Sequence, residues 1–189
     1  MVASNSDQND LPPFQTNGLL PVGDYPLTLD GLRVCHLVTG KFSGSDTWDR
    51  SHREYLVSQL EIMVVQLWQI GLDRIFIDGS FVENKDHPND IDGYFECDVR
   101  MFVSGALERQ LNALDPLKVW TWNAHHRRHD PDSAKAQLPM WHAYRVELYP
   151  HYNQISGIRD RYGNDLQFPA AFRKSRSGDL PKGIVRIIR

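Results

Sequence analysis

The residues best suited to chemistry lie between positions 79 and 92. A strand-like segment ends in Gly79 and Ser80, a turn-rich loop follows, and the next segment opens with Asp90, Ile91 and Asp92. Glycine lets backbone amides approach a ligand closely, and a serine hydroxyl can donate to a phosphate oxygen. Asp90 and Asp92, two apart on a strand, project from the same face with their backbones roughly 7 Å apart. We therefore expect their carboxylates to converge on Mg²⁺ or Mn²⁺ shared with substrate phosphates.

This spacing also has a plainer interpretation. Acidic pairs near the start of a strand are common, and a bare Asp-x-Asp often only caps or solvates a loop. The conjunction of a strand, a Gly-Ser bend, nine intervening residues and an Asp-apolar-Asp strand start favours a metal site. Lys85, in the intervening loop, is placed to approach a triphosphate, and surface exposure is its alternative.

The same residues resemble a known motif. Gly79 and Ser80 followed by Asp90, Ile91 and Asp92 resemble the defining motif of the DNA polymerase beta-like nucleotidyltransferase superfamily. That superfamily includes the minimal nucleotidyltransferases of toxin–antitoxin modules and the aminoglycoside nucleotidyltransferases. The close resemblance covers residues 75–96 and extends loosely to residue 148. Segments 17–21 and 182–187 are similar to those of an uncharacterised bacterial branch of the superfamily.

The resemblance implies specific roles. Gly79 and Ser80 would contact a nucleoside triphosphate, and Asp90 and Asp92 would bind the metal ions. A third carboxylate on a neighbouring strand completes such sites and activates the acceptor hydroxyl. Glu147 is the best candidate here for both the catalytic and the metal-binding role, and the alternative is an ion pair with Arg145. The implied reaction is attack of an acceptor hydroxyl on the α-phosphorus with release of pyrophosphate.

Several elements must position these residues. Apolar residues at three- and four-residue steps predict a long helix over residues 47–70, and Thr28 can cap a short helix. Alternating patterns predict strands over 90–99 and 142–148, with Tyr144, Val146 and Leu148 on one face of the latter. Further expected elements are an extended segment at 17–26, strands at 74–77 and 183–188, a helix at 105–114 and a polar loop at 123–138. We expect an α/β (α+β) fold: a flexible arm at 1–17 and one nucleotidyltransferase-like domain at 18–189, whose small mixed sheet is backed by helices.

Length and composition narrow the classes of protein. The chain has 189 residues, 41% hydrophobic and 24% charged, with a net charge of -3. No overall basic field indicates nucleic-acid binding. Cys35 and Cys97 cannot form a disulfide framework, and no zinc-like spacing accompanies them. The N-terminus is polar, and no apolar run approaches the roughly 18 residues of a membrane span. These features predict a cytoplasmic protein without membrane contact.

Other patterns keep two interpretations each. The basic run from His125 to His129 can contact a phosphate backbone or form a solvated loop. The tryptophans at 120, 122 and 141 can stack on a base or pack in the core. A second basic concentration, which can face phosphate or RNA, comprises Arg173, Lys174, Arg176, Lys182 and Arg186.

Three functional hypotheses follow. The first is an enzyme that transfers a nucleoside monophosphate from ATP or another triphosphate to a hydroxyl of a protein, an RNA end or a small molecule. The second is a non-catalytic nucleotide-binding or regulatory component of a toxin–antitoxin-type module. The third is a structural domain with an accidental acidic turn. Because so short a chain has little room to recognise a large acceptor, a homodimer or a partner protein can complete the cleft.

Overall fold

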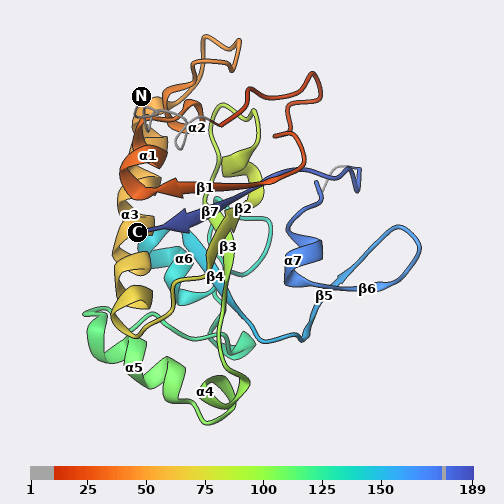
Figure 1. Cartoon of the computed structure of the whole chain (residues 1–189). Coiled ribbons are helices and arrows are strands. Elements are labelled where there is room, and N and C mark those ends of the chain that lie inside the picture. The colour runs from red at the N-terminus through yellow and green to blue at the C-terminus, as the bar shows by residue number, and fades with distance from the viewer. Residues whose placement is uncertain (1–10, 176–177) are drawn as a thin grey trace, which may run out of the picture.

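The central feature is a five-stranded mixed β-sheet. A computed structural model describes residues 11–175 and 178–189 (Figure 1). The strands lie in the order β1-β7-β2-β3-β4, and a separate two-stranded hairpin pairs β5 with β6. The bounds are β1 Asp24–Thr28, β2 Ile75–Asp78, β3 Ile91–Glu96, β4 Val146–His151, β5 Ile155–Arg159, β6 Asp165–Gln167 and β7 Ile184–Ile188.

The sheet is mixed because its strands arrive from distant parts of the chain. β1 pairs with β7, and β3 with β4, in parallel, whereas β2 is antiparallel to both β3 and β7. The last strand thus inserts between the first two and joins the chain ends within one sheet. The expected α+β architecture with a small mixed sheet and flanking helices is confirmed.

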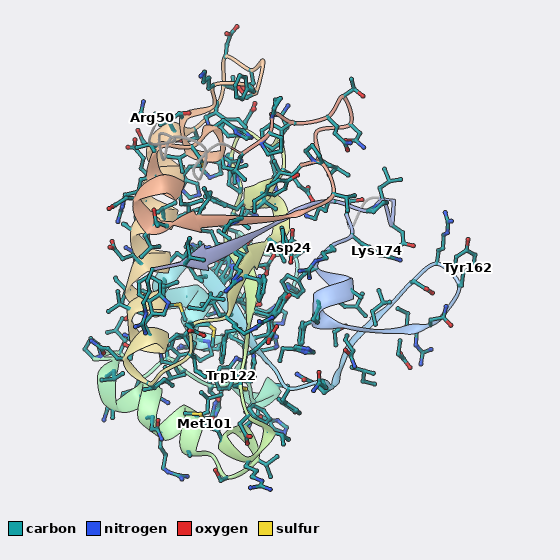
Figure 2. The ribbon with its side chains drawn as sticks, viewed as in Figure 1. Asp24, Arg50, Met101, Trp122, Tyr162 and Lys174 are labelled. Carbon is teal, nitrogen blue, oxygen red and sulfur yellow. The ribbon has the colours of Figure 1, made fainter. Side chains whose placement is uncertain are left out.

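Helices cover the two faces of the sheet unequally (Figure 1). The longest helix, α3, packs on one face, and α7 and the hairpin lie on the other. The helix bounds are α1 Leu29–Val34, α2 His36–Thr39, α3 Arg50–Gln69, α4 Val99–Val103, α5 Ala106–Leu114, α6 Pro139–Tyr144 and α7 Phe168–Ala171. Two 3₁₀ helices are η1 Gly79–Val82 and η2 Ala124–His126. The hairpin extends away from the body, with Tyr162 near its tip (Figure 2).

Strand alternation separates two apolar clusters. Residues such as Ile77, Ile91 and Phe95 belong to the main core beneath α3. Phe76 and Tyr94, which point to the other face, form a smaller cluster with Phe172 of the segment after α7. Ile91 and Phe95 therefore face α3, and Tyr94 faces the other side of the sheet.

One predicted strand begins later than expected and is preceded by a short helix. Residues 142–148 were expected to be extended, but the chain is helical over Pro139–Tyr144, and the strand begins at Val146. Proline is favoured at the first helical position, and Arg145 ends the helix in a left-handed conformation, with φ 53°. Of the three residues that suggested alternation, Tyr144 is a buried helix position, whereas Val146 and Leu148 lie in the strand. Tyr144 therefore does not share a strand face with Val146 and Leu148.

The other expected elements are found with small shifts. Helices occur at 50–69 and 106–114, strands at 75–78 and 184–188, and Thr28 accepts a hydrogen bond from the Gly31 amide as the cap of α1. The strand expected at 90–99 ends at Glu96, because Asp98 caps the start of α4. The sequence did not predict α4, α7 or the hairpin.

The start of the chain is described only from Leu11. Residues 1–10 of the expected arm lie outside the described residues. Leu11 is 5% exposed and belongs to the main core, and Phe14 packs edge-on against His36 with ring centroids 4.9 Å apart. Within the described residues, none of the helices has the length and apolar character needed to cross a membrane.

Candidate functional site

Three acidic residues lie side by side across the sheet. In the strand register, Asp92 of β3 stands opposite Asp78 of β2 and also opposite Glu147 of β4. Residues that are directly opposed on neighbouring strands point to the same face. All three carboxylates therefore lie on the face that α3 leaves uncovered. This row brings two expected residues together and adds Asp78, which the sequence did not single out.

The Gly-Ser bend, formed by Gly79 and Ser80, lies against Asp92. Gly79 has a φ of 73°, a left-handed conformation that favours glycine. A Cβ atom built on Gly79 would lie 2.7 Å from Oδ2 of Asp92 and 3.1 Å from its Cβ. No side chain fits in that space without displacing Asp92. The predicted proximity of the bend and the acidic pair is therefore a feature of the structure.

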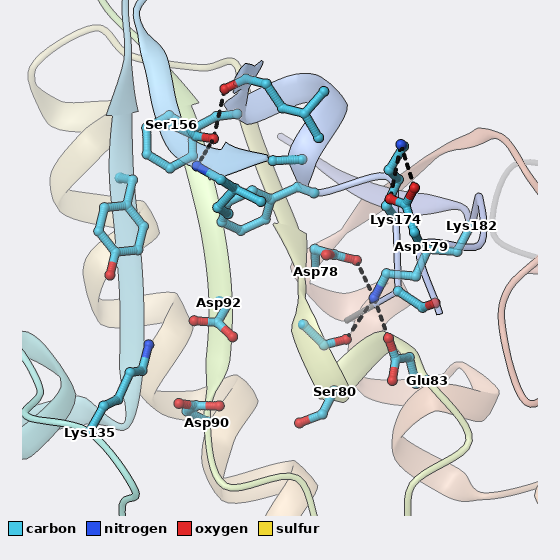
Figure 3. Close-up of a pocket in the computed structure, with 18 of the residues that line it drawn as sticks. Asp78, Ser80, Glu83, Asp90, Asp92, Lys135, Ser156, Lys174, Asp179 and Lys182 are labelled. Atoms are coloured by element: carbon cyan, nitrogen blue, oxygen red, sulfur yellow. Dashed lines mark hydrogen bonds and ion pairs between the residues drawn. The ribbon is translucent and has the colours of Figure 1, made fainter. Parts of the chain in front are cut away.

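Asp90 and Asp92 line the same cavity, which has a volume of about 1270 Å³. Figure 3 shows both carboxylates at the start of β3, with Ser80 across from Asp90. Asp92 is buried, whereas Asp90 is half-buried and accepts a hydrogen bond of 2.7 Å from Nε1 of Trp141. The indole fixes one carboxylate oxygen of Asp90, so this side chain is oriented before any ligand binds.

Ser80 and Lys85 also line the cavity. The half-buried Ser80 lies in η1, and its hydroxyl makes no hydrogen bond with another described residue. Lys85 is exposed, and its ammonium has no ion pair within the described part of the chain. Both groups are thus placed to contact an anionic ligand. The other basic residues of the lining are Arg127, Lys135, Arg159, Arg161, Lys174 and Lys182.

Glu147 has a different environment from the two aspartates. Its side chain is 1% exposed and is absent from the described residues that line the cavity. Oε1 accepts a hydrogen bond of 3.0 Å from the Leu138 amide and lies 3.5 Å from Nη1 of Arg127, and Oε2 accepts from the Tyr149 hydroxyl. Burial and the adjacent Glu147 raise the pKa of Tyr149 far above its usual range, so this hydroxyl stays protonated and donates.

The residues that could hold a metal ion are Asp90 and Asp92. Across the described residues, no group of three or more His, Cys, Asp or Glu side chains is arranged to hold a metal ion. The structure does not bring Glu147 to the place expected of a third ligand, because both its oxygens are already bonded. Mg²⁺ is commonly held by one or two carboxylates together with water and substrate phosphates. Asp90 and Asp92 fit that mode of binding.

The buried Lys182 contacts the Gly-Ser bend and the residue before it. Lys182 is 1% exposed, and its ammonium lies 3.0 Å from Asp78 Oδ1, 2.5 Å from Glu83 Oε1 and 3.2 Å from the Gly79 carbonyl oxygen (Figure 3). Burial raises the pKa of Asp78 to about 7, and the lysine opposes that rise. The sequence showed Lys182 only as one of several C-terminal basic residues, because its partners lie about a hundred positions earlier.

A buried arginine fixes the loop after the bend. Arg53 of α3 is fully buried and donates to the backbone carbonyls of Leu37, Phe81, Glu83 and Lys85. Its guanidinium also lies 3.9 Å from the ring centroid of Trp48. Burial lowers the pKa of Arg53 to about 9. The sequence signal was a charged residue within the apolar stripe of the predicted helix.

The remaining candidates divide between the cavity and the core. Within the basic run from His125 to His129, only Arg127 is a described lining residue of the cavity. Trp120 and Trp122 pack in the main core. The Trp120 indole donates to Gln66 Oε1, and the Trp122 indole donates to the Leu148 carbonyl oxygen.

Several of the C-terminal basic residues have acidic partners. Arg173 is paired with Asp24, Lys174 pairs with Asp179 and lines the cavity, and Arg176 lies outside the described residues. Lys174 and Lys182 line the same cavity, so this part of the basic concentration lies at the candidate site.

Comparison with known proteins covers nearly the whole chain. A model described as a family of unknown function (DUF6932) matches residues 12–188. No curated protein and no solved structure matches the chain. Because the match includes every strand of the sheet and every residue of the site, the chain is a member of the DUF6932 family.

Proposed function

We propose that the protein is a metal-dependent nucleotidyltransferase. It moves a nucleoside monophosphate from a nucleoside triphosphate to a hydroxyl of a protein, an RNA end or a small molecule and releases pyrophosphate. The observation that carries this proposal is the contact between Gly79 and Asp92 at the edge of a cavity that Asp90 also lines. A glycine-serine bend against two carboxylates is an arrangement suited to holding phosphates beside a divalent cation.

Charge and size of the cavity support a nucleotide ligand. Ligand pockets commonly enclose about 300–1,000 Å³, so a cavity of about 1270 Å³ has room for a nucleotide and part of an acceptor. Asp90 and Asp92 lie at the start of β3, and the unpaired Lys85 and Lys135 lie elsewhere around the cavity within the described residues. Aromatic rings of Tyr149 and Phe168, stacked with centroids 5.4 Å apart, provide an apolar wall.

The proposed roles follow from these positions. Asp90 and Asp92 hold Mg²⁺ or Mn²⁺, which supplies charge neutralisation for the phosphates. The Gly-Ser bend brings its backbone and the Ser80 hydroxyl to the phosphate oxygens, and Lys85 adds positive charge. Trp141 keeps the Asp90 carboxylate oriented. Catalysis by such a site consists of positioning and electrostatic stabilisation, with no covalent intermediate on the protein.

The cellular setting is part of the proposal. Cys35 and Cys97 are both free thiols in the structure, which suits a reducing compartment such as the cytoplasm. The cleft that binds the acceptor can be completed by a second copy of the chain or by a partner protein.

Incorporation of label tests the function. The purified protein is incubated with each α-labelled triphosphate and Mg²⁺ or Mn²⁺, and label transfer and pyrophosphate are measured. We expect metal-dependent pyrophosphate release that Asp92→Asn removes without unfolding the protein. Nucleotide-dependent thermal stabilisation without pyrophosphate would support the non-catalytic regulatory alternative. Full activity of the Asp92→Asn variant would refute the assignment of the site.

A further inference from the structure

The pairing of Arg127 with Glu147 has no role in the proposed reaction so far. Arg127 Nη1 lies 3.5 Å from Glu147 Oε1, and its Nη2 donates a hydrogen bond of 3.1 Å to the Tyr149 hydroxyl. The same hydroxyl donates to Glu147 Oε2. Arg127, Tyr149 and Glu147 therefore form one closed network on the face of β4 that α3 leaves uncovered.

The position of Glu147 makes this network significant. Glu147 is directly opposite Asp92 in the parallel β3–β4 register, so the two backbones are about 4.8 Å apart. A carboxylate at this place lies within reach of a cation bound by Asp92 if its side chain turns toward the cavity. In the structure the cationic partner of Glu147 is a guanidinium.

Arg127 is the more exposed member of the pair. Its side chain is 26% exposed, it lines the cavity, and it follows the short helix η2 in an irregular segment. Its remaining hydrogen bonds go to two neutral oxygens, the Tyr149 hydroxyl and the Ala136 carbonyl. A polyphosphate in the cavity offers a guanidinium charge-assisted bidentate bonds, which are stronger than such neutral ones.

We propose that Arg127 is an electrostatic latch that withholds Glu147 from the divalent cation until a polyphosphate enters the cavity. The phosphate draws Arg127 away from Glu147, and the buried carboxylate, left without its cation, turns to join Asp90 and Asp92. Polyphosphate binding and full coordination of the cation are thereby coupled, and the coupling acts equally in both directions. This inference rests on the proposed function, and in it Arg127 is a positioning residue.

Binding of Mn²⁺ alone tests the latch without turnover. Titration calorimetry compares the wild-type chain with Arg127→Met and with the double variant Arg127→Met/Glu147→Gln. We expect Arg127→Met to raise the Mn²⁺ affinity about fivefold or more, the usual range for such coupling, and the double variant to return to the wild-type value.

A matched control and a milder variant complete the experiment. Arg128→Met removes the same charge at the next position, but Arg128 is exposed and is not a described lining residue of the cavity, so the affinity should not change. Tyr149→Phe removes one hydrogen bond from Glu147 while keeping the ring, and should raise the affinity by a smaller factor. This variant also tests the latch if Arg127→Met fails to fold.

The outcomes separate the latch from the proposed function. Unchanged Mn²⁺ affinity in both Arg127→Met and Tyr149→Phe, or an increase that persists after Glu147→Gln, would overturn the latch. If Asp92→Asn binds Mn²⁺ as the wild type does, the metal site itself is absent and the proposed function fails. Inorganic tripolyphosphate without metal should bind Arg127→Met more weakly than Arg128→Met. Equal affinities for these two variants would also contradict the latch.

Discussion

Gly79 lies directly against the Asp92 side chain, and the space between them has no room for a side chain on Gly79. Strand β2 pairs with β3 so that Asp78 is opposite Asp92. The bend begins at the next residue, and the α-carbon of Gly79 faces the Asp92 carboxylate. The conformation of the bend and the position of the carboxylate therefore depend on each other. A substitution at Gly79 should therefore displace the Asp92 carboxylate.

Gly79→Ala tests this dependence. The substitution places a methyl group 2.7 Å from Asp92 Oδ2 and forces alanine into a left-handed conformation. We expect the free energy of unfolding to fall by about 2–4 kcal/mol, from backbone strain plus overpacking. Urea denaturation measures the loss, and Mn²⁺ affinity should fall in the same variant.

Gly71→Ala is the matched control for that substitution. Gly71 has a φ of 84°, and a Cβ there meets nothing within 4 Å, so only the backbone strain applies. The expected loss is about 1–2 kcal/mol, with Mn²⁺ affinity unchanged. Equal losses of stability and metal affinity in the two variants would show that the contact with Asp92 is unimportant.

Arg53→Met tests the support of the loop between the bend and Asp90. The methionine cannot donate to the carbonyls of Leu37, Phe81, Glu83 and Lys85, and buried acceptors without partners are costly. We expect a loss of about 3 kcal/mol or more in unfolding free energy, measured by chemical denaturation.

Arg50→Met, on the same helix, is its control. Arg50 is exposed and pairs with Glu54 one turn away, and such surface pairs contribute little. The unfolding free energy of Arg50→Met should fall by less than about 0.5 kcal/mol. Comparable losses for Arg50→Met and Arg53→Met would remove Arg53 from the account of the loop.

Thiol reactivity provides a pH-dependent test of the core. Burial disfavours the thiolate and raises the pKa of Cys35 to about 11 from an ordinary 9.0. In a Cys97→Ser variant, the alkylation rate of the native protein should rise about tenfold per pH unit from pH 8 to pH 10, because only the thiolate reacts. The unfolded protein, whose thiol is exposed, should level off near pH 9. A plateau near pH 9 in the native protein would contradict the burial of Cys35.

The sequence predicted the local geometry of the bend and of strand β3 better than that of their surroundings. The pattern around Gly79, Ser80, Asp90 and Asp92 is local, and alternation within β3 assigns Ile91 and Asp92 to opposite faces correctly. That pattern also placed Lys85 at the cavity. Short-range spacing was sufficient because the bend and the acidic strand are consecutive in the chain.

Long-range partners could not be predicted in the same way. Lys182 reaches Asp78, and Arg173 reaches Asp24, only because β7 inserts between β1 and β2. The sequence contains no signal for that insertion. Glu147 was assigned to the correct strand and face, yet its hydrogen bonds to Tyr149 and the Leu138 amide depend on tertiary packing. The start of the strand predicted at 142–148 was wrong because Tyr144, at the end of a short proline-initiated helix, continues the alternation of Val146 and Leu148.

The most direct test of the account is binding of a non-hydrolysable nucleotide. Titration calorimetry with α,β-methylene ATP and Mn²⁺ compares the wild-type chain, Asp92→Asn and Asp98→Asn, whose exposed side chain caps α4 outside the cavity. The account predicts that the wild type and Asp98→Asn bind alike and that Asp92→Asn loses about tenfold or more in affinity. Equal binding by Asp92→Asn and the wild type would contradict the claim that this carboxylate holds the metal and its nucleotide.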